Sequence, residues 1–270
     1  MKVKSLVLDG YGLNCGYETD YSFKLAGADS ERVHINELLW GNKSLEDYHI
    51  LALIGGFSWG DDHGAGILEA SKLKYNIKEE IEKFIKDGKL IIGICNGFQT
   101  LVNFGLLPGF DGNYDSREVA LISNDCGNFR DDWVHLKINE KSPCIFTKDI
   151  KKIDLPIRHG EGKFYAEESV IEKLFDENQV VLQYCKEDKL ANREFPYNPN
   201  GSLHDIAGIC DPSGRIFGLM PHPEAYNAFT NHPNWTREKE IYKRRGETIP
   251  GEGQGVQIFR NAVEYIKSEL

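Results

Sequence analysis

The sequence predicts an α/β fold in which a mostly parallel central sheet is flanked by helices on both faces. Residues 50–54 and 90–94 are short, fully apolar runs, as expected for parallel strands that are buried on both sides. Segments with helical periodicity alternate with these runs, which is typical of crossover connections in such sheets. Together these observations indicate flavodoxin-like layering.

In the first half of the chain, strands are expected at residues 4–8, 32–36, 50–54 and 90–94. A helix over residues 18–26 is closed by Gly27, since glycine commonly ends helices. A second helix over residues 77–86 places its isoleucines and Phe84 on one face. A third, over residues 97–104, stops at Gly105.

The second half is richer in short strands, mainly between residues 115 and 210. Strands are expected at residues 134–138 and 180–184, and a proline-containing loop at 193–202. Residues 256–270 read as a closing amphipathic helix. No internal repeat divides the chain, so residues 1–270 are interpreted as a single domain.

Composition excludes several classes of protein. Net charge is −10, which argues against a general nucleic-acid binder, because phosphate contacts require clustered Lys and Arg. No apolar run is long enough to span a membrane, and the apolar stretch at the N-terminus is too short for a signal peptide. The six cysteines form no Cys-x-x-Cys pair, so we expect no zinc or other metal site and no disulfide framework. A cytoplasmic protein is predicted.

The strongest single motif is Gly93-Ile94-Cys95-Asn96-Gly97. An apolar strand runs into a Gly-x-Cys-x-Gly turn, and a helical pattern follows, which is the cysteine counterpart of a nucleophile elbow. The amino end of the helix favours an ionised thiol at Cys95. A buried cysteine at a tight strand–helix junction is the alternative interpretation.

A second motif, Pro221-His222-Pro223-Glu224, follows another apolar strand. The two prolines stiffen the loop, and residues i and i+2 of an extended segment point the same way. Glu224 can therefore orient one nitrogen of His222 while the other faces Cys95, which is the logic of a catalytic triad. Taken alone, the motif would be read as a surface loop.

Gly55 and Gly56 follow the strand at residues 50–54. Glycines at the carboxyl end of a strand let backbone N–H groups approach a ligand. The backbone N–H groups of Gly56 and Asn96 are therefore predicted to form an oxyanion hole. A plain glycine turn or a phosphate-binding loop is the alternative, although no Gly-Lys-Ser/Thr sequence follows.

These motifs resemble those of class I (triad) glutamine amidotransferases, and in particular the glutaminase subunits of phosphoribosylformylglycinamidine synthase. The resemblance covers about residues 1–225 and rests on segments 55–61, 93–99, 156–164, 198–202 and 221–224, and less closely on 128–133. It implies that Cys95 forms a γ-glutamyl thioester, that His222 and Glu224 complete the triad, and that Gln99 helps to hold glutamine.

The resemblance also implies partners. Ammonia released from glutamine would pass to a large synthetase subunit, with a small accessory subunit, in purine biosynthesis. This chain would need no cofactor of its own, whereas ATP and magnesium would belong to the synthetase. The segment after Glu224, at about residues 226–270, is longer than the usual ending of the family. It is either a solvated insertion or a docking segment, and its basic residues lie at 237, 239 and 243–245.

Other readings stay open. A glutaminase of another amidotransferase complex, a cysteine peptidase or deglycase-like hydrolase, and a catalytically idle binding subunit are the rivals. Cys15 lies in a first loop that only partly matches the family, and a structural role is favoured for it. His159 is expected near the active site or a partner interface without a direct chemical role.

Overall fold

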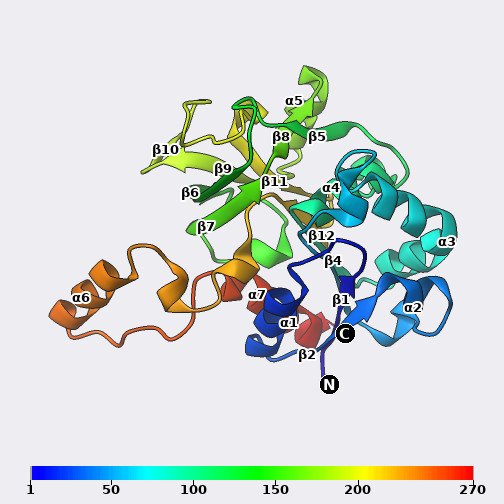
Figure 1. Ribbon diagram of the computed structural model, residues 1–270, viewed down its shortest axis with the longest axis horizontal. Helices are drawn as coiled ribbons and strands as arrows, with labels where there is room; N and C mark the ends of the chain where they lie inside the picture. The colour runs from blue at the N-terminus through cyan, green and yellow to red at the C-terminus, as the bar shows by residue number, and fades with distance from the viewer. Residues whose placement is uncertain (1, 270) are drawn as a thin grey trace.

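The computed structural model describes residues 2–269 and is built around one ten-stranded sheet (Figure 1). Its order is β2-β1-β3-β4-β12-β11-β9-β6-β7, with β10 paired to β9. The strands are β1 Lys4–Asp9, β2 Asp29–His34, β3 Ile50–Leu53, β4 Leu90–Ile94, β6 Arg130–Ile138, β7 Lys152–His159, β9 Val180–Lys186, β10 Lys189–Leu190, β11 Ile206–Cys210 and β12 Ile216–Leu219. A separate hairpin pairs β5 Val119–Ser123 with β8 Glu161–Ala166.

Four of the helices pack in two pairs against this sheet. They are α1 Gly16–Leu25, α2 Ile35–Leu39, α3 Ile67–Lys86, α4 Asn96–Phe104, α5 Glu168–Asp176, α6 Trp235–Arg245 and α7 Val256–Glu269. Figure 1 shows α1 with α7 on one side of the parallel strands and α3 with α4 on the other. Phe23 of α1 meets Phe259 of α7 edge to face, 4.8 Å between ring centroids. The predicted α/β class is therefore confirmed.

The sheet has two halves with different strand directions. Strands β2, β1, β3, β4 and β12 run parallel, whereas β12, β11, β9, β6 and β7 pair antiparallel in succession. The parallel half is fully buried at β3 and β4, as their unbroken apolar sequences predict. Its carboxyl edge carries the candidate site, because β4 ends one residue before Cys95 and β12 ends three residues before His222.

The predicted elements are present, and most differ from their predicted bounds by one to four residues, whereas α3 differs by ten. Helix α3 begins at Ile67, ten residues before the predicted start, and the predicted start coincides with a kink at Ile77, whose φ is −133°. Strand β2 ends at His34, because the side chain of this residue accepts a hydrogen bond from the N–H of Asn36 and caps α2. The second predicted strand was therefore displaced toward the C-terminus by about two or three residues.

The segment at about residues 226–270 divides into two unlike parts. Helix α7 is part of the core: Ile258, Phe259 and Ala262 have no exposed surface. Residues between η6 (Pro223–Ala225) and α7 instead project from the body and carry α6, in which no residue is buried. Within residues 2–269, no helix combines the length and apolar character that a bilayer crossing requires.

Candidate active site

Cys95 occupies the strained turn between β4 and α4. Its φ of 53° and ψ of −105° lie outside the regions that side chains favour, as expected for a nucleophile elbow. The backbone N–H donates to the carbonyl of Leu219 on β12 at 2.8 Å. Glycine is required at position 97, because a Cβ there would lie 2.0 Å from the carbonyl oxygen of Leu53. Cys95 is 5% exposed, and its sulfur lies 3.7 Å from the carbonyl oxygen of Arg158.

His222 and Glu224 form a buried pair at the end of β12. The ring Nδ1 and the Glu224 Oε1 are 2.5 Å apart, and the two residues are 1% and 0% exposed. Burial alone would lower the pKa of His222, but the Glu224 carboxylate, followed by the sulfurs of Cys95 and Cys15, outweighs it. The pKa of His222 consequently lies well above its ordinary value, so the site stabilises an imidazolium.

The structure brings Cys95 and this pair together at one edge of the sheet. Strands β4 and β12 are parallel neighbours with Ile94 opposite Leu219, so the segments that follow them lie side by side. Cys95 is close enough to His222 to raise the pKa of its ring. The Nε2 atom of His222 is buried without a hydrogen-bond partner among the described residues, which leaves one ring nitrogen free for proton transfer.

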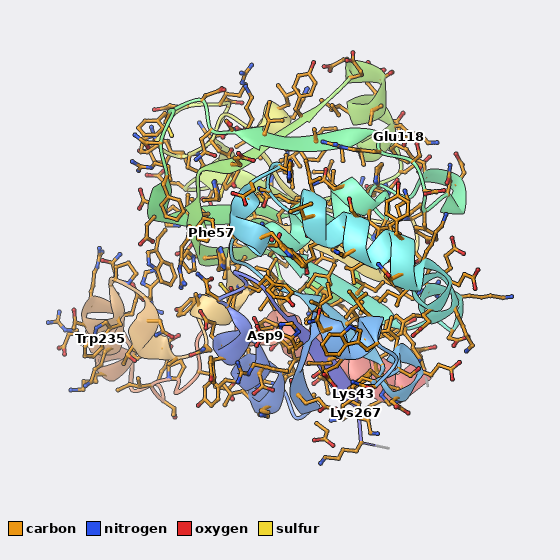
Figure 2. All side chains as sticks on the ribbon, turned by 45° about the vertical axis from the view of Figure 1, so that its right-hand side comes forward. Asp9, Lys43, Phe57, Glu118, Trp235 and Lys267 are labelled. Carbon is orange, nitrogen blue, oxygen red and sulfur yellow. The ribbon has the colours of Figure 1, made fainter. Side chains whose placement is uncertain are left out.

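The predicted oxyanion donor Gly56 lies in the loop that follows β3. The residues on either side of Gly56 are hydrogen-bonded to the loop between β1 and α1. Phe57 N–H donates to the carbonyl of Gly12 (2.9 Å), and Asn14 N–H donates to the carbonyl of Gly55 (3.3 Å). The N–H group of Gly56 itself takes part in neither of these two hydrogen bonds. Its φ of 148° suits glycine, and Figure 2 shows the next residue, Phe57, at the surface.

Asn96 offers a second donor. It is the first residue of α4, and the first N–H groups of a helix have no partner within the helix. Its side chain also ties the surrounding loops together. The Asn96 Oδ1 accepts from the N–H of Ser58 (3.4 Å), and its Nδ2 donates to Asp61 (3.2 Å). The loop that carries Gly56 is thus held against the helix that carries Cys95.

Gln99 is buried close to this network, but its amide already has partners. The Nε2 donates to the carbonyl of Glu161 at 2.7 Å, and the Oε1 accepts from Asn96 Nδ2 at 3.4 Å. In this conformation Gln99 fixes the turn between β7 and β8 to α4. Contact with glutamine would require one of these bonds to be exchanged.

Two residues near the triad were not predicted to act there. The sulfur of Cys15 lies 3.9 Å from Nδ1 of His222, and burial raises the pKa of the Cys15 thiol. His159 is buried beside Asn124, and burial, with the nearby charge of His222, lowers its pKa to about 3. The available signal for Cys15 was the partial match of its Asn-Cys loop to the family.

Cys15, His222 and Glu224 are the residues within 2–269 whose ligand atoms converge, all lying within 4.8 Å of one another. The Nδ1 and Oε1 atoms are bonded to each other at 2.5 Å. Two ligands of one zinc ion normally lie about 3.3 Å apart, given metal–ligand distances near 2.0–2.2 Å. The group therefore has the geometry of a histidine–carboxylate pair and not of a metal centre.

Comparison with known proteins agrees with this site. Residues 2–266 match the model of the CobB/CobQ-like glutamine amidotransferase domain. The PurQ subunit of phosphoribosylformylglycinamidine synthase from Methanococcus maripaludis strain C7 is 49% identical over 97% of both chains. The PurQ subunit from Dehalococcoides mccartyi is 45% identical over 98% of both. A chain in the structure of PurLQS from Thermotoga maritima superimposes with a TM-score of 0.68 at 30% identity, covering 98% of this chain and all of that one.

The fold and the matching domain define a glutamine amidotransferase. Within that class, the chain belongs to the PurQ family of phosphoribosylformylglycinamidine synthase subunits. The relatives match over nearly the whole chain, including the segment around α6, which lies beyond the predicted range of the resemblance at residues 1–225. That segment is consequently shared with part of the family.

Proposed function

We propose that this chain is the glutaminase subunit of a phosphoribosylformylglycinamidine synthase. It hydrolyses glutamine to glutamate and ammonia and passes the ammonia to a large synthetase subunit, which acts with a small accessory subunit. The observation that supports this most strongly is the placement of a thiol, on a strained turn, beside a buried histidine–carboxylate pair. The PurQ relatives and the PurLQS structure supply the acceptor reaction and the partner.

In the proposed mechanism, Cys95 attacks the side-chain amide carbon of glutamine. The oxyanion accepts hydrogen bonds from the N–H groups of Gly56 and Asn96. His222 gives a proton to the departing ammonia, and a γ-glutamyl thioester forms on Cys95. His222 then takes a proton from water, which attacks the thioester and releases glutamate. Glu224 holds the ring orientation and stabilises its charged form throughout.

The synthetase and the accessory subunit would carry out the part of the reaction that this chain does not. No step above requires a cofactor, so we place ATP and magnesium on the synthetase. The enzyme would work in the cytoplasm. Cys95 and His222 are almost entirely covered, which supports a free subunit with low activity and a complex with higher activity. Full-rate hydrolysis by the isolated chain, unchanged by the synthetase, would contradict this coupling.

The proposed nucleophile is tested by labelling and substitution. A diazo-ketone analogue of glutamine should add to Cys95, as a mass shift on the peptide that contains it. Cys95→Ala and Cys95→Ser should abolish glutamine-dependent synthesis by the complex and leave ammonia-dependent synthesis intact. Peptide or glycated-amine hydrolysis without glutamine turnover would instead favour a peptidase or deglycase-like enzyme. Loss of both nitrogen sources would mean that the substitution disrupts assembly.

A further inference from the structure

The feature that the triad leaves unexplained is a projecting arm, defined here as residues 227–254. Helix α6 lies within it and has no buried residue. Figure 1 shows α6 well away from the sheet, and Figure 2 shows its first residue, Trp235, standing clear of the body. An isolated helix of this length is marginal in water. Apart from Tyr242, which packs edge to face on Phe229 at 5.9 Å, the helix makes little contact with its own chain and is therefore available to a partner.

The arm is held firmly at its base. Its two legs run antiparallel, with Phe229 N–H bonded to Gly251 O (3.2 Å) and Gly253 N–H bonded to Asn227 O (3.0 Å). A Cβ at position 253 would lie 2.3 Å from the carbonyl oxygen of Tyr226, so glycine permits the close approach. Further out, His232 stacks edge to face on Trp133 at 4.8 Å. These contacts fix where the arm projects, as a docking element requires.

The charge of α6 is opposite to that of the rest of the molecule. Five basic and two acidic side chains give the helix +3, so the remaining residues carry −13 of the chain total of −10. Arg244 pairs with Glu240 of the same helix at 3.1 Å. The other four basic residues, Arg237, Lys239, Lys243 and Arg245, have no ion pair within residues 2–269. Lys239 lies over the ring of Trp235 in the same helix at 5.6 Å, and no acidic side chain of the described residues neutralises this cationic surface.

We propose that α6 docks onto an acidic surface of the synthetase subunit. The unpaired cations favour an acidic protein surface, whereas the net charge of −10 and the interleaved Glu238 and Glu240 disfavour a nucleic-acid backbone. This inference rests on the function proposed above and identifies one element of its partner interface.

The base of the arm places this contact next to the triad. The outgoing leg begins at Asn227, three residues after Glu224, and Asn227 Nδ2 donates to the carbonyl of Glu224 at 2.8 Å. The returning leg closes against the same point, since Gly255 N–H donates to Tyr226 O at 3.1 Å. A shift of the arm on docking is therefore transmitted to the backbone that carries the triad carboxylate.

The test compares binding of full-length chains to the synthetase subunit of the same organism. The variant Arg237→Glu/Lys243→Glu/Arg245→Glu reverses three unpaired charges. The control Lys72→Glu/Lys86→Glu/Lys141→Glu makes the same change of net charge at exposed lysines without an ion pair elsewhere on the described surface. We expect the arm variant to raise the Kd at least tenfold at low salt, with a shallower salt dependence, and the control to stay within about threefold.

A second variant tests whether a loss of binding comes from local misfolding of the charge-reversed arm. Replacing residues 231–249 with a short Gly-Ser loop should leave the bridge between Ala228 and Glu252 closed and give the same loss of binding. Unchanged binding by both arm variants would overturn the inference. So would light scattering showing that α6 instead joins two copies of this chain. Glutaminase activity and Cys95 labelling of the isolated variants separate the two proposals, because neither depends on α6 if only docking is lost.

Discussion

Substituting Gly97 by alanine probes the close packing that positions the nucleophile. The new Cβ would lie 2.0 Å from the carbonyl oxygen of Leu53 and 2.4 Å from its carbonyl carbon. Ordinary contact begins near 3.4 Å, so α4 and β3 must separate by about 1.4 Å, the difference between the two distances. Both contacting atoms are backbone, and no side-chain rotation relieves the clash. Cys95 is the N-cap residue of α4, so the thiol moves with the helix.

We expect two measurable consequences of Gly97→Ala. Overpacking of this size costs roughly 1–3 kcal/mol of unfolding free energy, or about 2–10 °C in Tm for a chain of this size. A displacement near 1 Å at a reacting atom lowers kcat/KM by about 100-fold. Thermal unfolding and glutamate release by the complex measure the two effects. Gly251→Ala is the control, since its Cβ meets nothing within 4 Å. Native Tm and activity in Gly97→Ala would refute the packing argument.

Two further substitutions test the charges around the site. Glu224→Gln removes the charge that outweighs burial at His222, so the pKa of the His222 ring should fall in an NMR titration. A hydrogen bond to a charged group contributes roughly 1.5–3 kcal/mol, so its loss should lower kcat/KM by about 10- to 100-fold. An unchanged pKa of the ring would contradict this account. Burial raises the pKa of Glu69 from 4.5 to about 7. Between these two pH values the folded chain keeps the proton of Glu69, whereas the unfolded chain has released it. The free energy of unfolding therefore falls as the pH rises from 4.5 to about 7. Glu69→Gln should therefore raise Tm relative to the native chain by more at pH 8 than at pH 5, and an equal difference at both values would argue against a buried, titrating carboxyl.

The parts of this fold that were predictable are those in which local sequence and tertiary environment agree. Strand β4 was predicted with its correct bounds because every residue from Leu90 to Ile94 is buried, which leaves no polar position to obscure the pattern. The first ten residues of α3 were missed for the opposite reason. Glu69 is buried there among apolar neighbours, and its side chain instead contacts Thr100 of α4 at 2.9 Å. A tertiary contact of this kind has no local sequence signal.

The candidate active site likewise contains residues that the sequence predicts and residues that it does not. Cys95, His222 and Glu224 each follow an apolar strand, and parallel pairing of those strands brings them together without further information. Cys15 and the carbonyl of Arg158 reach the site from segments far away in the sequence. A backbone carbonyl has no residue type to mark it, and Cys15 resembles the other buried cysteines. Their positions depend on loop conformations that the spacing of motifs does not determine.

The thiol of Cys95 is covered by the end of β7 and the turn that follows it. The carbonyl of Arg158 covers the thiol of Cys95 at 3.7 Å, and the same turn is tied to α4 through Gln99 and Glu161. We expect glutamine to reach Cys95 when the turn between β7 and β8 moves. That turn ends the strand whose Pro156 carbonyl accepts the N–H of His222 at 2.8 Å, and His222 lies five residues before the start of the arm. The turn and the arm are therefore connected through one short backbone segment, residues 222–226.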